Sequence, residues 1–253
     1  MKKLIKGVSK SMHKLELEFL NVNWNKFGLE DPLWAVSTAA DKRWGGWALK
    51  DFFEEGEGTI AYVMDHLKSL RVPLRFGRAL DFGCGVGRLT QALAKRFETI
   101  YGIDIAESMI EKAKELCDLS NVKFMANRSK DLKVFASNHF DFIITLITLQ
   151  HIPKDLALGY ISEFVRVAKP GGVITFHVPA KWVDPKAPAP RVEIPQDPAE
   201  NVEKHGPIML MSGIPKSEVI KLLHRCGADV VDVIENTWSG PEWLSYHYYA
   251  VKK

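Results

Sequence analysis

The chain alternates short apolar runs with longer segments whose apolar residues recur every three or four positions. Runs of four to eight apolar residues are typical of buried strands, and the periodic segments are typical of amphipathic helices. The runs predict strands at 78–82, 100–104, 122–126, 140–146 and 173–178, with a closing pair at 230–237 and 245–251. The periodic segments predict core helices at 59–69, 88–97, 108–116, 154–167 and 216–226. This alternation predicts an α/β fold, a parallel sheet covered by helices on both faces.

The first 58 residues lack strand-like runs. Apolar residues at helical spacing predict a helix at 10–25, and the stretch 24–53 is rich in aromatic residues. We predict a helical N-terminal cap or lid over 1–58 and a core over 59–253, with Thr59 as the N-cap of the first core helix. The aromatic residues of the cap either pack against the core or line a ligand pocket.

The alternation stops between Val178 and Lys216. Repeated prolines interrupt this segment, which also holds Trp182 and Met209-Leu210-Met211. Proline suppresses regular elements and stiffens the chain, and a long connection inside a compact domain is usually functional or disordered. We predict that 179–215 is an insertion covering the substrate; a mobile surface loop is the alternative.

The first two predicted core strands frame the most informative motif of the chain. Residues 79–87 read Ala-Leu-Asp-Phe-Gly-Cys-Gly-Val-Gly, and Asp104 ends the next strand. Glycine lets the backbone turn sharply and lets a ligand approach closely. The carboxylate of Asp104 can accept hydrogen bonds from both ribose hydroxyls. A β-α-β unit followed by such an acid binds a nucleoside-containing cofactor at the carboxyl ends of parallel strands.

The glycine spacing argues against a dinucleotide. That fingerprint requires Gly-x-Gly-x-x-Gly. Counting from Gly83, the third glycine position holds Arg88, and counting from Gly85 it holds Thr90. A dehydrogenase or a non-catalytic nucleotide-binding domain is therefore the weaker interpretation.

The pattern from Asp81 to Gly87 instead resembles the first motif of class I S-adenosylmethionine-dependent methyltransferases. Similar features follow in the same order: the acid Asp104, the strand 140–144, and Lys-Pro-Gly-Gly at 169–172. The resemblance extends over 62–253 and is greatest to the small-molecule branch of the family. It implies a Rossmann-like, seven-stranded, mostly parallel sheet with an antiparallel last strand. It also implies S-adenosylmethionine as cofactor and S-adenosylhomocysteine (SAH) as product.

The resemblance further implies roles for residues around the glycine loop. Asp81 is expected to bind the methionine amino group, directly or through water. Arg88 either pairs with the methionine carboxylate or is a surface residue at a helix start. Asp104 is expected to hold the ribose diol. The other residues implied at the cofactor are Gly83, Gly85, Gly87, Ile105, Met109 and Leu146, of which Met109 is either an adenine contact or a core residue.

One departure from the family concerns adenine. Many relatives have Gly-Asp after the third strand, whereas this chain has Asn127-Arg128. Arg128 cannot accept a hydrogen bond from the adenine amino group. We therefore expect adenine recognition from Asn127, Ser129, backbone groups or a repositioned Asp131.

Two histidines are the catalytic candidates. The segment 149–153, Leu-Gln-His-Ile-Pro, resembles one that often supplies an active-site histidine in small-molecule members. Methyl transfer depends largely on positioning, and a base is needed only if the acceptor arrives protonated. A histidine with a pKa of about 6.5 suits that task. We rank His151 first and His177 second; otherwise, His151 is a structural residue bonded to backbone at a helix start.

Composition narrows the class of protein. The 253 residues, 46% of them hydrophobic, allow one substantial core and a smaller cap. No apolar run approaches the roughly 20 residues of a membrane-spanning helix. Three cysteines without metal-ligand spacing predict reduced thiols and a cytoplasmic location, and no metal site is expected. A net charge of +3 is too mild to indicate a nucleic-acid surface.

We therefore predict a methyltransferase acting on an oxygen or nitrogen of a small metabolite, sugar or natural product. The alternative is an RNA or protein methyltransferase, supported only by the mild positive charge and the basic N-terminus. Residues 146–149 read Leu-Ile-Thr-Leu and lack the Asn/Asp-Pro-Pro-Tyr-type motif that would hold a planar amine. A non-catalytic cofactor-sensing module is a third possibility. The acceptor and the oligomeric state cannot be read from the sequence.

Overall fold

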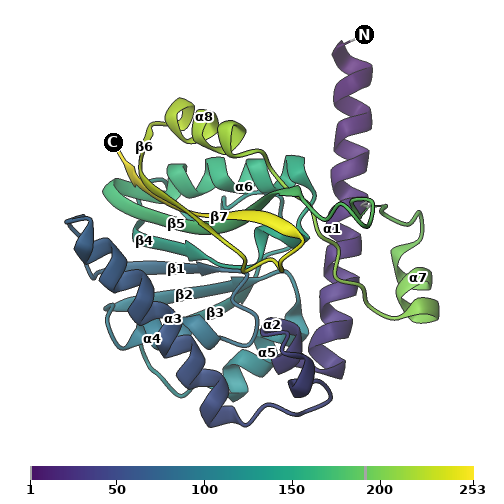
Figure 1. Ribbon diagram of the computed structural model, residues 1–253, viewed down its shortest axis with the longest axis horizontal. Helices are drawn as coiled ribbons and strands as arrows, with labels where there is room; N and C mark the ends of the chain where they lie inside the picture. Colours follow the sequence, from purple (N-terminus) through teal and green to yellow (C-terminus); the bar gives the residue numbers. More distant parts are fainter. Residues whose placement is uncertain (1, 191–192) are drawn as a thin grey trace.

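A single seven-stranded sheet forms the centre of the protein (Figure 1). The computed structural model describes the backbone of residues 2–190 and 193–253. It describes the side chains of residues 12–190 and 193–253. The strands are β1 (Arg78–Phe82), β2 (Thr99–Asp104), β3 (Val122–Ala126), β4 (Phe140–Thr145), β5 (Ala168–Trp182), β6 (Ala228–Asn236) and β7 (Trp243–Lys252). Their order is β3-β2-β1-β4-β5-β7-β6, and β7 is antiparallel to both of its neighbours. The predicted α/β fold with an antiparallel last strand is confirmed.

Helices cover both faces of this sheet, as the buried apolar stripe of each helix requires. They are α1 (Lys2–Glu30), α2 (Pro32–Val36), α3 (Leu49–Ser69), α4 (Arg88–Ala94), α5 (Glu107–Glu115), α6 (Lys154–Val167), α7 (Pro198–His205) and α8 (Lys216–Cys226), with short 3-10 turns η1 (Ala40–Lys42) and η2 (Leu149–His151). Helices α3, α4 and α5 lie on one face, and α6 and α8 on the other (Figure 1). Within the described part of the chain, no helix has the length and apolarity needed to cross a membrane.

Helix α3 is longer than predicted. It begins at Leu49 rather than at Thr59. Thr59 is not an N-cap, because it lies inside the helix and its hydroxyl donates to the carbonyl of Glu55 four residues earlier. The expected boundary between cap and core at 58/59 therefore falls within a continuous helix, and the division into cap and core stays a prediction.

The segment 179–215 is also more ordered than its prolines predict. Strand β5 continues to Trp182, and beyond Phe176 it pairs with β7 but not with β4, so Pro179 lies where the strand has a neighbour on one side; the register shifts between Pro179 and Lys181. Helix α7 follows, with the Asp197 carboxylate accepting a hydrogen bond from the backbone of Glu200 at 2.9 Å. Residues 191 and 192 of this predicted insertion lie outside the described residues.

Helix α1 crosses the edge of the sheet where the parallel strands end (Figure 1). The side-chain amide of Asn21 donates to the carbonyl of Ile105, just after β2, at 2.8 Å. Asn23 exchanges two hydrogen bonds with the backbone of Ile208, at 2.8 and 2.9 Å. Helix α1 therefore joins the β2–α5 connection to the segment that precedes α8. The side chains of the basic residues Lys2, Lys3 and Lys6 lie outside the described side chains.

Candidate functional site

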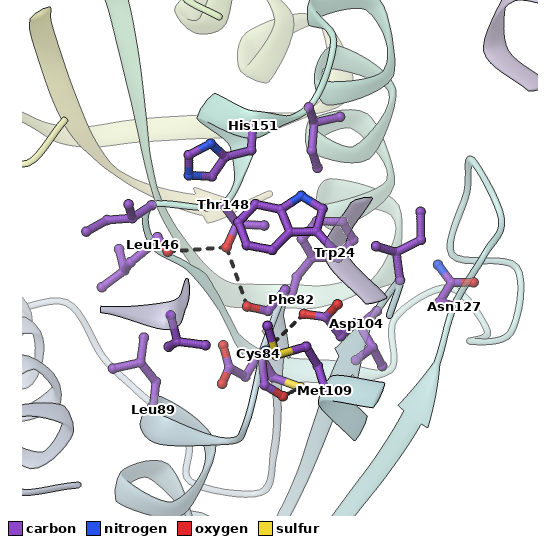
Figure 2. A pocket seen from close by; sticks show the side chains of 18 of the residues that line it. Trp24, Phe82, Cys84, Leu89, Asp104, Met109, Asn127, Leu146, Thr148 and His151 are labelled. Carbon is purple, nitrogen blue, oxygen red and sulfur yellow. Dashed lines mark hydrogen bonds between the residues drawn. The ribbon is translucent and has the colours of Figure 1, made fainter. Parts of the chain in front are cut away.

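A cavity opens at the carboxyl ends of β1, β2 and β4 (Figure 2). Loops after parallel strands meet at this edge, so it is where α/β folds place ligands. The predicted residues that line it are Asp81, Gly83, Gly85, Arg88, Asp104, Ile105, Met109, Asn127, Leu146 and His151. The structure does not bring Gly87, Ser129 or His177 to the lining of this cavity. Most of the residues predicted from the sequence thus share one space.

The glycine loop forms part of the cavity wall with backbone atoms. Gly83 and Gly85 have φ angles of +70° and +51°, a conformation that favours glycine. A Cβ atom on Gly83 would collide with the side chain of Thr148, and one on Gly85 would collide with Val36 of α2. The loop is therefore closely packed between the segment after β4 and the N-terminal region.

Asp104 connects the end of β2 to this loop. One carboxylate oxygen accepts a hydrogen bond from the backbone N–H of Gly85 and the other accepts one from that of Ala106, each at 2.9 Å. Burial raises the pKa of Asp104, whereas the backbone hydrogen bonds act in the opposite direction. Each oxygen still has a lone pair with which to accept from a bound hydroxyl.

Asp81 and Arg88 bring opposite charges to the other end of the cavity. Asp81 is 2% exposed and accepts a 2.6 Å hydrogen bond from the hydroxyl of Thr90, and burial raises its pKa to about 6. Arg88 is 7% exposed, and its Nη1 lies 3.6 Å from a carboxylate oxygen of Glu55. The Nε atom of Arg88 is buried without a hydrogen-bond partner. Buried unpaired donors are rare, so this site fits a ligand with a carboxylate.

At the adenine end, Asn127 is the candidate that lines the cavity. Its side-chain amide donates to the carbonyl of Asp131 at 3.2 Å. Arg128 pairs with Glu107 at 2.7 Å, and the Asp131 carboxylate accepts a hydrogen bond from Ser129. Asn127 is therefore better placed than Ser129 or Asp131 to contact an adenine ring.

Two of the predicted residues have apolar surroundings. Met109 is 1% exposed and packs in a cluster with Phe27 and Phe52 while also lining the cavity. The two roles left open by the sequence are thus compatible. Ile105 lines the same cavity and is half-buried.

The N-terminal aromatics divide between the two expected roles. Trp24 lines the cavity, and Figure 2 shows it beside the space that His151 and Asp104 also face. Its ring lies 5.2 Å from that of His151. The other aromatics of the stretch do not line the cavity; they are Phe27, Trp34, Trp44, Trp47, Phe52 and Phe53. Leu20, four residues before Trp24 and so on the same helix face, also lines it.

Ile147 is a further lining residue, in the segment 146–151 whose position after the fourth strand predicts that it faces the site of methyl transfer. Its φ angle is +58°, a left-handed conformation that is a genuine outlier for a β-branched side chain. Such strain costs on the order of 1–3 kcal/mol and clusters at functional sites. The strained residue lies directly between β4 and η2, where the cavity wall turns.

His151 is buried in η2 and has two hydrogen-bond partners. Its Nδ1 lies 2.7 Å from the carbonyl oxygen of Leu210, and its Nε2 lies 3.1 Å from the side-chain nitrogen of Gln150. Burial lowers its pKa to about 4. The imidazole is therefore neutral at pH 7 and can accept a proton or a hydrogen bond.

His177 occupies a different environment. It is fully buried in β5, with Nε2 3.1 Å from the side-chain oxygen of Asn236, and burial lowers its pKa to about 4. Its ring lies 5.5 Å from that of Trp238. It lines neither the first cavity nor the one beside it, so the structure gives no support to its ranking as a catalytic residue.

A second, wider cavity adjoins the first. The two share the residues Ala35, Val36, Arg88, Leu146, Ile147 and His151. Further walls come from α3, from the segment before α8 and from the β6–β7 connection, including Tyr62, Met209, Met211, Trp238, Ser239 and Trp243. The β6–β7 residues could not be predicted, because nothing in their local pattern differs from an ordinary turn. The paired cavities suit a cofactor and a second molecule.

Residues 79–172 match a protein-family model described as a methyltransferase domain. Curated relatives include ubiquinone biosynthesis O-methyltransferases from Methylococcus capsulatus and Pseudomonas fluorescens. The first is 34% identical over 102 residues, covering 39% of this chain and 42% of that protein. The second is 33% identical over 108 residues, covering 42% and 46% respectively. The matched stretch thus spans less than half of these relatives.

Solved structures share the fold over a larger part of the chain. Magnesium protoporphyrin IX methyltransferase from Synechocystis, crystallised with bound SAH, superposes with a TM-score of 0.55 at 22% identity, covering 79% of this chain and 85% of that chain. A Leishmania major methyltransferase described as dependent on S-adenosylmethionine superposes with a TM-score of 0.58 at 19% identity, covering 90% and 83%. At these identities, the likeness concerns the fold.

Proposed function

We propose, from the premise that this chain belongs to the class I S-adenosylmethionine-dependent methyltransferase family, that it methylates an oxygen or nitrogen of a small molecule. The observation that carries the proposal is the pairing of two adjoining cavities. One is lined by the glycine loop and Asp104, and the other shares the wall around Leu146 and His151.

The first cavity supplies groups that match each part of the cofactor. We propose that Asp104 accepts hydrogen bonds from the ribose hydroxyls and that Asp81 binds the amino group. The unpaired Nε of Arg88 would donate a hydrogen bond to the carboxylate of the cofactor's methionine part. Asn127 would accept from adenine, because its amide nitrogen is already engaged by the carbonyl of Asp131. When bound, the cofactor supplies an electrophilic methyl group on a sulfonium sulfur.

The lining of the second cavity supports a small acceptor rather than a nucleic acid. Among the described residues that line it, Arg88 is the only lysine or arginine, and it faces Glu55. Nucleic-acid binding depends mainly on basic groups that neutralise phosphates. The aromatic and methionine side chains favour an acceptor with an apolar body.

We propose that His151 receives the proton of an acceptor that arrives protonated. It is neutral at pH 7 and lines both cavities. Leu210 orients the ring through Nδ1, and Nε2 would take the proton once the acceptor displaces the hydrogen bond from Gln150. We also propose a cytoplasmic location, which the free thiols of Cys84, Cys117 and Cys226 support.

Isothermal titration with SAH tests the cofactor assignment directly, because it needs no acceptor. We expect binding in a one-to-one ratio, followed by SAH formation from S-adenosylmethionine when a suitable acceptor is supplied. A folded protein that binds neither SAH nor S-adenosylmethionine would refute the proposed function. Binding without turnover across a broad panel of alcohols, phenols and amines would instead favour a cofactor-sensing role.

A further inference from the structure

A chain of hydrogen bonds links three separate segments beside the second cavity. The hydroxyl of Ser239, in the β6–β7 connection, donates to the side-chain oxygen of Gln150 at 2.9 Å. The side-chain nitrogen of Gln150 lies 3.1 Å from Nε2 of His151. Nδ1 of His151 lies 2.7 Å from the carbonyl oxygen of Leu210.

The chemistry of these groups fixes the tautomer of His151. A carbonyl oxygen only accepts, so Nδ1 of His151 carries the hydrogen and donates to Leu210. An amide nitrogen only donates, so Nε2 carries the lone pair and accepts from Gln150. Because Ser239 donates to the amide oxygen of Gln150, the amide cannot turn over without losing a hydrogen bond.

Gln150 is held firmly in this position. Its side chain is 4% exposed, and its backbone carbonyl accepts a 2.7 Å hydrogen bond from the backbone of Ser212. Gln150 lines the second cavity, and His151 lines both cavities. The bond between their side chains therefore lies where an acceptor would approach the cofactor.

We propose that Gln150 is a specificity-determining residue: the reacting group of the acceptor displaces the bond between the two side chains, donates to Nε2 of His151 and accepts a hydrogen bond from the amide nitrogen of Gln150. A group in that position must accept one hydrogen bond and donate another. A hydroxyl does both and keeps a second lone pair to attack the methyl group, whereas a neutral amine has a single lone pair, which the attack itself uses, and an ether cannot donate. This inference rests on the proposed function and narrows the acceptor to an alcohol or a phenol.

No charged side chain that lines the two cavities is hydrogen-bonded to His151 in the described part of the chain. The titratable side chains that line the two cavities are Glu55, Tyr62, Asp81, Cys84, Arg88, Asp104, Tyr160 and Glu242. The hydrogen bonds of His151 to described residues go to Gln150 and Leu210 instead. Burial also lowers the pKa of His151 to about 4, so Nε2 is unprotonated at neutral pH and can exchange its hydrogen bond from Gln150 for one from the acceptor.

Nitrogen-15 NMR of the histidine rings, recorded on the SAH-loaded full chain at pH 7, tests the inference. We expect His151 to be neutral with its hydrogen on Nδ1. Phenol should shift the Nε2 signal, whereas anisole and benzylamine, which match it in size, should leave that signal unchanged. Equal shifts from phenol and anisole, or a hydrogen on Nε2 in the free protein, would overturn the proposal.

Two variants separate the role of Gln150 from simple packing. In Gln150→Glu the carboxylate only accepts, so we expect His151 to become doubly protonated and phenol binding to weaken about tenfold, the loss of roughly one hydrogen bond. Ser239→Ala frees the amide and should produce a smaller change of the same signals. Gln91→Glu, whose side chain bonds the carbonyl of Leu116 away from the cavities, is the matched control.

The same samples distinguish two kinds of failure. If SAH does not bind in isothermal titration, the proposed function fails, whatever the state of His151. If SAH binds normally but Gln150→Glu leaves the His151 signals and the phenol affinity unchanged, the inference about Gln150 fails alone. Should Gln150→Glu not fold, the Ser239→Ala spectra and the phenol–anisole comparison on the unaltered protein decide the matter.

Discussion

The carboxylate of Asp104 accepts a hydrogen bond from the backbone N–H of Gly85 at 2.9 Å. This bond ties the end of β2 to the loop after β1. The side chain that we propose to bind the ribose therefore also holds the loop that contacts the rest of the cofactor. Loss of this carboxylate should therefore have two effects: it removes a direct contact to the ribose, and it loosens the loop after β1.

Replacing Asp104 by alanine is expected to weaken SAH binding about 10- to 100-fold, since hydrogen bonds to a charged group contribute roughly 1.5–3 kcal/mol. Asp104→Asn keeps one acceptor oxygen and should lose less. Isothermal titration measures both affinities. Asp118→Ala, which removes an exposed carboxylate after α5, is the control and should bind normally. Unchanged affinity in a folded Asp104→Ala protein would contradict the assignment.

Arg88 is expected to recognise only the amino-acid part of the cofactor. Its buried Nε has no hydrogen-bond partner among the described residues. Arg88→Gln should therefore weaken SAH binding about tenfold or more, because a charged hydrogen bond to the carboxylate is lost. It should leave binding of 5′-methylthioadenosine, which lacks that carboxylate, nearly unchanged. Arg96→Gln removes an exposed arginine after α4 and serves as control; equal losses for both ligands would argue against this role.

The protonation of Asp81 is expected to make cofactor affinity depend on pH. Burial raises the pKa of Asp81 to about 6, and an ammonium group can pair only with the charged form. SAH affinity should therefore increase as the pH rises from 5 to 7. Titrations in buffers of different ionisation enthalpy should detect proton release at the lower pH. Asp81→Asn should flatten the profile, and a profile that keeps its slope in this variant would assign the effect to another group.

The raised pKa of Asp81 also affects the stability of the protein without bound cofactor. The unfolded chain loses the Asp81 proton near its ordinary pKa of 3.8, whereas the folded chain keeps it until about pH 6. The contribution of this group to stability is therefore largest at low pH and declines as the pH rises between those values, by on the order of 2–3 kcal/mol. Urea denaturation of the unaltered chain and of Asp81→Asn at pH 5 and 7 isolates this contribution.

The contact between Gly85 and α2 is open to a double-mutant test. Gly85→Ala introduces a Cβ at a φ of +51° and a collision with Val36, so we expect a loss of more than about 1 kcal/mol in unfolding free energy. Val36→Ala removes the collision but not the backbone strain. The double variant should thus recover part of the loss, measured by urea denaturation. Strict additivity of the two effects would show that the residues do not touch.

Much of the fold could be predicted because the strands are short apolar runs buried between helices. Strand β3 and helices α6 and α8 have the predicted bounds. Helix α3 could not be placed correctly, because Gly56 and Gly58 lower helix propensity over its first half. Burial of Phe52 and Ile60, both at 0% exposure, offsets this propensity in the folded chain.

The candidate site likewise contains some residues that could be predicted from the sequence and others that could not. The predicted residues of the first cavity lie within or just after motifs that resemble those of the methyltransferase family, and this resemblance indicated them. The walls of the second cavity come from segments such as those around Tyr62, Met209 and Trp238, which only the tertiary structure brings together. Trp24 falls between these cases, since the sequence left open whether the N-terminal aromatics pack or line a pocket.

The walls of the second cavity lie mostly outside residues 79–172, the stretch that matches the methyltransferase domain. Under the proposed function, the residues that would bind the acceptor can therefore differ between homologues while the proposed cofactor residues stay the same. Overall identity across 79–172 is then a poor guide to which compound a homologue modifies. Homologues are better sorted by the amino acids at positions 36, 62, 209 and 238, and grafting those four residues between two enzymes should carry substrate preference with them.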